Sequence, residues 1–309
     1  MSQFFRVIIV IKLLFLLLLT TLCSHSLAAP DNQLLRRLDL QRGLFTDTYQ
    51  HFDINGQPII YVLQENTTAM TRGVAVMIAD SGIPLVSQQG FSALADELNK
   101  VGWVTILLPA PDIGFMPTLA QDVAVENDEK IAVAEETDTS TEKQIPSAPI
   151  VDLNISQSAV TSIDEQAFIE HEQQLVALLQ ATIKRSQEYP GFFLVISKGT
   201  SAAWLSKIYA QKTLAAPDAF VAISPFWPDR ELNQRIPQWV ASTPMPVLDL
   251  YNNQDNGWSQ TTVAQRKIAT VKSLKLQYRQ RELLGFNKYR QYSTYVGKEI
   301  YGWVSHMGW

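Results

Sequence analysis

The stretch Gly191-Phe-Phe-Leu-Val-Ile-Ser-Lys-Gly-Thr-Ser-Ala-Ala-Trp204 decides the fold. Residues 192–196 form a short apolar run, small and flexible residues follow it at once, and a helical pattern begins near Ser201. A buried parallel strand that turns sharply into a helix has this pattern. The tip of the turn falls on Gly199, which has no side chain. The sequence therefore predicts a tight strand–turn–helix element with a glycine at its apex.

Strands and helices alternate on both sides of this element. The order predicts an α/β fold with a mostly parallel sheet and helices on both faces. The terminal helix carries an apolar stripe that we expect to pack on the sheet. The predicted strands are residues 50–53, 57–64, 73–80, 103–109, 192–196, 219–223, 246–251 and 274–284, and the predicted helices are residues 88–101, 164–187, 201–211, 232–239, 262–271 and 293–307.

The N-terminus has the three regions of a secretory signal peptide. A short basic start precedes an apolar run, and Ser26-Leu27-Ala28 fits the small-x-small cleavage pattern. We expect cleavage after Ala28, export to the periplasm, and one domain over residues 29–309, with no membrane span left. An uncleaved anchor is the alternative, although the clean apolar core of residues 13–22 is short for a spanning helix.

Composition excludes several classes of function. The chain has 309 residues, of which 46% are hydrophobic, and its formal net charge is −5, with no basic cluster of the nucleic-acid-binding type. Cys23, the only cysteine, lies inside the predicted signal, so the exported product has no disulfide or thiolate chemistry. His51, His171 and His306 are too scattered for a metal site, and His171 is expected on a solvated helix face. No nucleotide, flavin or phosphate-loop motif is present, so no cofactor is expected.

An acidic stretch interrupts the alternation of strands and helices. Residues 122–143 contain eight acids and two lysines, with small residues between them. Such a segment buries too little apolar surface to offset the entropy of ordering it. We therefore predict a disordered surface insertion at about residues 115–160. In the alternative interpretation, this insertion binds a basic partner in the cell envelope.

Five short motifs carry a resemblance to a known family. They are Gly102-Trp103 leading to Leu107-Leu108-Pro109, the turn at Gly199, Pro246-Val-Leu-Asp249, Tyr278-Arg279-Gln280 and Gly302-Trp303. As a set they resemble an uncharacterised family of exported bacterial proteins in the α/β-hydrolase superfamily. The resemblance spans roughly residues 57–309. It implies an α/β-hydrolase-like fold and an exported location, and it implies no established activity.

The residues needed for hydrolysis are incomplete. An α/β-hydrolase places its nucleophilic serine at the apex of a G-x-S-x-G turn, and a histidine after the last strand. Here the apex is Gly199, and residues 284–288 contain no histidine. The sequence therefore favours a non-catalytic binding or scaffolding role in the cell envelope, for an unknown ligand or protein. The predicted binding region, suited to an acyl or anionic group, is Ser81, Gly82, Lys198, Gly199 and Thr200.

The alternative hypothesis is a serine hydrolase, esterase or peptidase-like, with a rearranged site. Gly199-Thr200-Ser201-Ala202-Ala203 fits a shifted G-x-S-x-A pattern and makes Ser201 the nucleophile. Asp255 would then be the acid and His306 the base. This hypothesis requires Ser201 and His306 within hydrogen-bond reach. Ser201 equally suits the N-cap of the following helix, and Asp255 equally suits a turn.

Overall fold

The structure, a computed structural model, describes residues 49–54, 56–85, 87, 90–111, 165–283 and 290–309. The predicted signal peptide and the predicted acidic insertion lie outside these residues.

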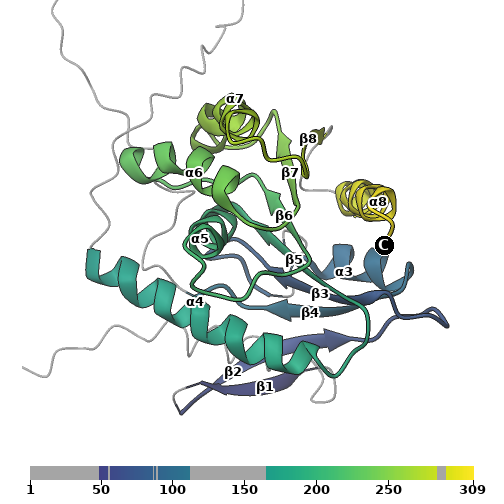
Figure 1. Cartoon of the computed structure of the whole chain (residues 1–309). Helices are drawn as coiled ribbons and strands as arrows, with labels where there is room; N and C mark the ends of the chain where they lie inside the picture. Colours follow the sequence, from purple (N-terminus) through teal and green to yellow (C-terminus); the bar gives the residue numbers. More distant parts are fainter. Residues whose placement is uncertain (1–48, 55, 86, 88–89, 112–164, 284–289) are drawn as a thin grey trace, which may run out of the picture. The chain divides into compact units, whose positions relative to one another are not determined.

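A single eight-stranded sheet forms the centre of the fold, in the order β1-β2-β4-β3-β5-β6-β7-β8 (Figure 1). β1 and β2 form the expected hairpin, β2 runs antiparallel to β4, and every other pairing is parallel. The prediction of an α/β fold with a mostly parallel sheet is confirmed. The strands are β1 (Gln50–Ile54), β2 (Gln57–Gln64), β3 (Gly73–Ile78), β4 (Trp103–Leu108), β5 (Phe192–Lys198), β6 (Ala219–Ile223), β7 (Val247–Asn252) and β8 (Tyr278–Leu283).

Helices cover both faces of the sheet because the central strands are apolar throughout. Every residue of β3, β4 and β6 is buried, as expected for strands with no solvent-facing side. α4, α5 and α6 lie on one side of the sheet, and α3 and α8 pack together on the other (Figure 1). The helices are α3 (Ser92–Asn99), α4 (Glu165–Ser186), α5 (Gly199–Ala210), α6 (Arg230–Ser242), α7 (Gly257–Lys272) and α8 (Arg290–His306).

The apolar stripe predicted for the terminal helix is buried, but α8 packs mainly against α3. The buried residues of the stripe are Val296, Ile300, Trp303 and Val304.

Four helices, α5, α6, α7 and α8, begin earlier than predicted. α7 begins at Gly257 because the Asn256 side chain accepts a hydrogen bond from the Ser259 amide, 2.9 Å away. α5 begins at Gly199 and not at Ser201, with Lys198 as the extended residue before it. The predicted N-cap role of Ser201 is therefore wrong, because this serine lies inside the first turn.

The last strand is shorter than predicted. Residues 274–277 form the turn between α7 and β8, in which the amides of Leu274 and Lys275 donate to the carbonyls of Val271 and Thr270 at the end of the helix. This is a Schellman ending, with Leu274 in the left-handed conformation at φ +55°. Glycine is the usual residue at such a position.

A buried ion pair fixes α7 to the sheet. The Arg266 guanidinium donates to both carboxylate oxygens of Asp249 on β7, at 2.8 and 3.1 Å, and both side chains are fully buried. Tyr278 and Gln280 of β8 donate to the same carboxylate at 2.6 and 3.0 Å. Two of the resemblance motifs, Pro246–Asp249 and Tyr278–Gln280, thus meet in one satisfied network. Burial and the neighbouring Asp249 charge raise the pKa of Tyr278.

Candidate functional site

The turn between β5 and α5 has the sharp geometry expected of a nucleophile elbow. Gly199 takes a left-handed conformation with φ +61° directly after the strand. Glycine alone takes this conformation without a side-chain penalty. The amide nitrogens of the first turn of α5 point toward the carboxyl edge of the sheet, where ligands of open α/β sheets bind.

The carboxylate of Asp80 occupies the space above Gly199. A Cβ atom built on Gly199 would lie 2.2 Å from the Asp80 Cγ and 2.3 and 2.5 Å from its two carboxylate oxygens. The sheet register explains this position, because β3 pairs with β5 in parallel and Ile78 lies opposite Ser197. Two residues beyond each partner, Asp80 therefore comes beside Gly199. An aspartate from a neighbouring strand fills the place where a hydrolase carries its nucleophilic side chain.

Two backbone amides and one hydroxyl converge on a single oxygen of this carboxylate. Asp80 Oδ1 accepts hydrogen bonds from the Thr200 amide at 2.8 Å, the Ser81 amide at 2.9 Å and the Thr200 hydroxyl at 2.6 Å. One amide follows the elbow apex and the other follows β3. In an acyl-transfer enzyme, amides at these two positions bind the developing oxyanion. Here they bind the chain's own carboxylate.

Opposing influences act on the charge of Asp80. Burial is the largest and raises the pKa of this carboxyl. The hydrogen bonds from Thr200 and the positive charge of Lys198 lower it, but less, and the net shift is upward.

The residues predicted to form a binding region therefore do come together at the elbow. Gly199, Thr200 and Ser81 surround the Asp80 carboxylate, Lys198 acts on it through its charge, and Gly82 continues the same loop. Their donors hold the chain's own Asp80 carboxylate, so the binding of an external acyl or anionic group stays a prediction. The sequence analysis missed Asp80 itself, which ends the apolar run of β3.

Ser201 does not sit as a nucleophile would. Its side chain is fully buried, and its hydroxyl donates to the Ala79 carbonyl at 2.7 Å. This bond ties the start of α5 to the end of β3. The hydroxyl is thus engaged inside the protein with the backbone at the end of β3.

The structure does not bring His306 to Ser201. His306 ends α8, and three residues later Trp309 stacks on Phe192 with ring centroids 4.7 Å apart. Phe192 is the first residue of β5, whereas Ser201 comes after the last residue of this strand. A strand of seven residues is roughly 20 Å long. His306 therefore lies at the opposite edge of the sheet.

The other two described histidines lie on β1 and α4. His51 is exposed on β1. The expectation that His171 is solvated is wrong, because it is 2% exposed and stacks on Trp204 of α5 with centroids 4.9 Å apart. The face of α4 that carries His171 packs against α5. The glutamates on either side of His171 in the sequence made this face look polar.

Asp255 lies at the edge of the sheet where a triad acid is expected, but its partner is a serine. It follows β7 and accepts a short hydrogen bond from the Ser224 hydroxyl and one of 2.8 Å from the Asn252 amide. Ser224 follows β6 and has φ +49°. Two residues later, the Phe226 amide donates to the Gly199 carbonyl at 3.4 Å. This carboxylate thus fixes a strained turn beside the elbow. The turn role expected for Asp255 agrees with these contacts.

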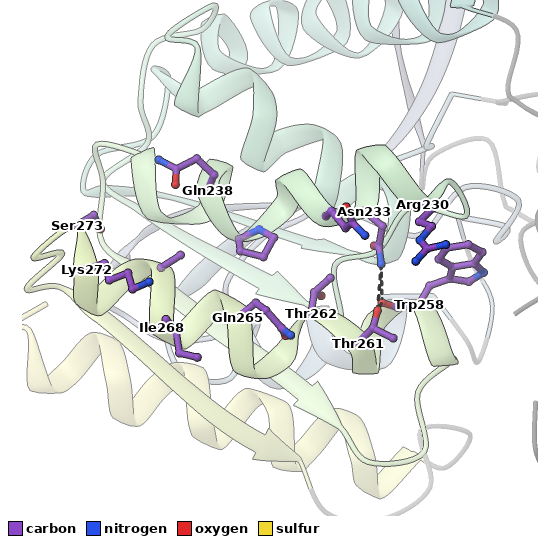
Figure 2. Close-up of a pocket in the computed structure, with 13 residues that line it drawn as sticks. Arg230, Asn233, Gln238, Trp258, Thr261, Thr262, Gln265, Ile268, Lys272 and Ser273 are labelled. Atoms are coloured by element: carbon purple, nitrogen blue, oxygen red, sulfur yellow. Dashed lines mark hydrogen bonds between the residues drawn. The ribbon is translucent and has the colours of Figure 1, made fainter.

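A groove with a volume of about 840 Å³ lies elsewhere, between α6 and α7 (Figure 2). Its buried amide, Asn233, already accepts from the Trp227 amide at 2.9 Å and donates to the Trp258 carbonyl at 2.9 Å and to the Thr261 hydroxyl at 3.3 Å. These contacts join the two helices to each other and already use three of the four hydrogen bonds that the amide can make.

The described residues include neither a metal-binding cluster nor a helix able to span a membrane. They contain no cluster of three or more His, Cys, Asp or Glu side chains placed to hold a metal ion. None of their helices has the length and apolar character required to cross a bilayer.

The comparison of family patterns identifies the chain. Residues 16–306 match the family described as "Protein of unknown function (DUF3530)", and the chain belongs to this family. No curated protein matches its sequence.

Solved structures with a similar fold are α/β-hydrolases. Est1E from Butyrivibrio proteoclasticus superposes with a TM-score of 0.53 at 11% identity, covering 84% of this chain and 99% of its own. A dienelactone hydrolase from Anabaena variabilis gives a TM-score of 0.49 at 12% identity, covering 84% and 98%. The likeness to Est1E shows an α/β-hydrolase-like fold, and at this identity it shows no more than the fold.

Proposed function

We propose that this DUF3530 protein is exported and uses its α/β-hydrolase-like fold for a non-catalytic binding or scaffolding role in the cell envelope. The observation that carries the proposal is the position of Asp80. Its carboxylate takes both amides of the would-be oxyanion hole and fills the space of the missing nucleophile. A substrate carbonyl has neither a nucleophile to meet nor free amides to bind.

Each part of the serine hydrolase mechanism is affected separately. The mechanism needs an activated nucleophile, a histidine base and preorganised N–H donors. Gly199 supplies no hydroxyl, and Asp80 consumes the donors. Among the described residues, no histidine reaches the elbow. All three parts are affected, so restoring one of them alone restores no activity.

The alternative of a rearranged serine hydrolase finds less support. Ser201 is buried with its hydroxyl bound to the Ala79 carbonyl, and His306 is at the other edge of the sheet. Asp255 holds Ser224 and not a histidine. A carboxylate hydrogen-bonded to a serine lacks the imidazole that shuttles the proton in the triad.

The test of the catalytic part is labelling with a fluorophosphonate probe, which reacts with activated serines. We expect no labelling of the folded protein under conditions that label a reference serine hydrolase. Ser201→Ala and Ser224→Ala variants serve as matched controls. Labelling that disappears in either variant would identify a working nucleophile and overturn the proposal.

Export is tested separately. A C-terminally tagged chain should be recovered in the periplasmic fraction, and Edman sequencing should begin at Ala29 if the predicted signal is cleaved. Recovery with the cytoplasmic fraction would overturn the envelope part of the proposal and leave the catalytic part untouched.

A further inference from the structure

The loop between α7 and β8 exposes two leucine side chains to solvent. Leu274 is 80% and Leu276 is 94% exposed, the latter being the most exposed of the large apolar side chains described. On the adjoining face of α7, Val271 and Ile268 are 67% and 52% exposed. We call these four residues the leucine ridge.

The residue between the two leucines is bound to the protein body. The Lys275 ammonium turns inward and donates to the carbonyls of Thr243 and Met245, the second at 2.9 Å, just past the end of α6. Leu274 and Leu276, on either side of Lys275 in this turn, are exposed. Lys275 therefore anchors the loop to the protein body between two exposed leucines.

The backbone at the ridge adds a second observation. Leu274 occupies the left-handed position of the Schellman ending, with φ +55°. Glycine is preferred there because every side chain costs conformational energy in that region. A large apolar residue in this position destabilises the free protein in two ways. Its backbone is held in a strained conformation, and its apolar side chain is exposed to water. Such local strain is often associated with function.

The charges around the ridge are of one sign. Residues 257–281 contain six Lys and Arg and no Asp or Glu, in a chain whose formal net charge is −5. Arg266 and Lys275 are turned inward, and Arg281 faces Glu299 at 3.7 Å. Lys267 and Lys272 remain exposed on α7, and helical spacing puts them on the same face as Ile268 and Val271. Figure 2 shows Ile268, Lys272 and Ser273 together at the α7 end that leads into the loop.

We propose that the leucine ridge is a membrane-docking surface, with the aliphatic side chains entering the interface of a bilayer rich in anionic phospholipid and Lys267 and Lys272 contacting its headgroups. Aliphatic side chains bordered by lysines, without carboxylates, are the pattern of interfacial membrane binding. The ridge lies on α7 and its loop, and the inference does not depend on the chemistry of the elbow.

The first measurement is cosedimentation of the purified full chain with vesicles. One set contains phosphatidylglycerol and phosphatidylethanolamine, and the other contains phosphatidylcholine only. The Leu274→Gly/Leu276→Ser variant should lose at least tenfold in partitioning to the anionic vesicles, and Lys267→Gln/Lys272→Gln should lose affinity and salt dependence. Met70→Ser is the matched control, because Met70 is 81% exposed and precedes β3, which lies four strands from β8 in the sheet order. It should remain within twofold of the parent protein.

A site-specific readout separates the ridge from any binding by residues 1–28. In a Cys23→Ser background, Leu276→Cys and Met70→Cys variants carry an environment-sensitive fluorophore. Anionic vesicles should shift the emission of the label at position 276 to the blue and leave the label at position 70 unchanged.

Three results would overturn the proposal. The leucine variant and the Met70→Ser control could bind vesicles equally. The label at position 276 could show no shift on vesicles to which the protein binds. Light scattering could instead show a dimer that the leucine variant dissociates, which would assign the ridge to a second copy of this chain.

Discussion

The mutual dependence of Gly199 and Asp80 gives the sharpest prediction. Replacing Gly199 with alanine places a Cβ 2.2 Å from the Asp80 Cγ, far inside van der Waals contact, so the carboxylate must leave its position. The residue must also hold φ +61° with a side chain, which costs about 1–2 kcal/mol. Expelling Asp80 breaks three hydrogen bonds to a charged group and costs about 2–4 kcal/mol more, since the freed donors are partly compensated by water.

We therefore expect Gly199→Ala to lower the free energy of unfolding by about 3–6 kcal/mol. Asp80→Ala alone should cost about 2–4 kcal/mol, since it loses the same hydrogen bonds without the backbone strain. In the double variant the collision is gone and only one loss of these bonds remains. Its cost should fall short of the sum of the single costs by about 2–4 kcal/mol.

The assay is urea unfolding followed by circular dichroism for the four proteins of this double-mutant cycle. If the two single costs add within about 0.5 kcal/mol, the sites are independent, and the assignment of Asp80 to the space above Gly199 is refuted. An unfolded Gly199→Ala protein that regains its structure when Asp80→Ala is added would support the same coupling.

Three further predictions follow from the described contacts. Asp80→Asn should flatten the dependence of stability on pH. Because the pKa of Asp80 is higher in the folded than in the unfolded protein, this residue stabilises the fold most in acid and loses the contribution as the pH rises from about 4 through its folded pKa. Urea midpoints measured across that range should therefore change with pH more steeply in the parent than in the variant. Arg266→Met should cost about 3–5 kcal/mol because it leaves Asp249 charged and buried, and adding Asp249→Leu should recover part of the loss; equal costs for the single and double variants in urea unfolding would argue against this. Leu274→Gly should stabilise the protein by about 0.5–1 kcal/mol by relieving the left-handed strain, as a thermal melt would detect, while it weakens vesicle binding.

The fold could be predicted from the sequence because its local signals agreed with the global arrangement of strands and helices. Uninterrupted apolar runs predicted buried parallel strands, and the abrupt change after Ile196 predicted the elbow with Gly199 at its apex. Element boundaries were harder. The start of α5 depends on backbone geometry at Lys198, and the end of α7 depends on Leu274 taking a conformation that leucine rarely adopts.

The key residue of the site was not predictable in the same way. Asp80 and Gly199 are 119 residues apart, and their meeting depends on β3 pairing with β5 in one register. A buried parallel strand has no alternation from which its register can be read. An aspartate closing an apolar run was visible in the sequence, but its partner was not. The basic run around the leucine ridge was likewise hidden by the net negative charge of the chain.

The contacts at the elbow suggest why its shape persists without a nucleophile. The Thr200 amide and hydroxyl hold Asp80, and the Ser201 hydroxyl holds the Ala79 carbonyl, so the start of α5 is bonded to the end of β3 at several points. Each of these bonds requires the sharp turn at Gly199. A serine at the apex would need the space that Asp80 fills, and Asp80 in turn needs an apex without a side chain. The same residues therefore stabilise the centre of the sheet, and a single substitution at either position removes stabilising bonds before it creates any reactive group.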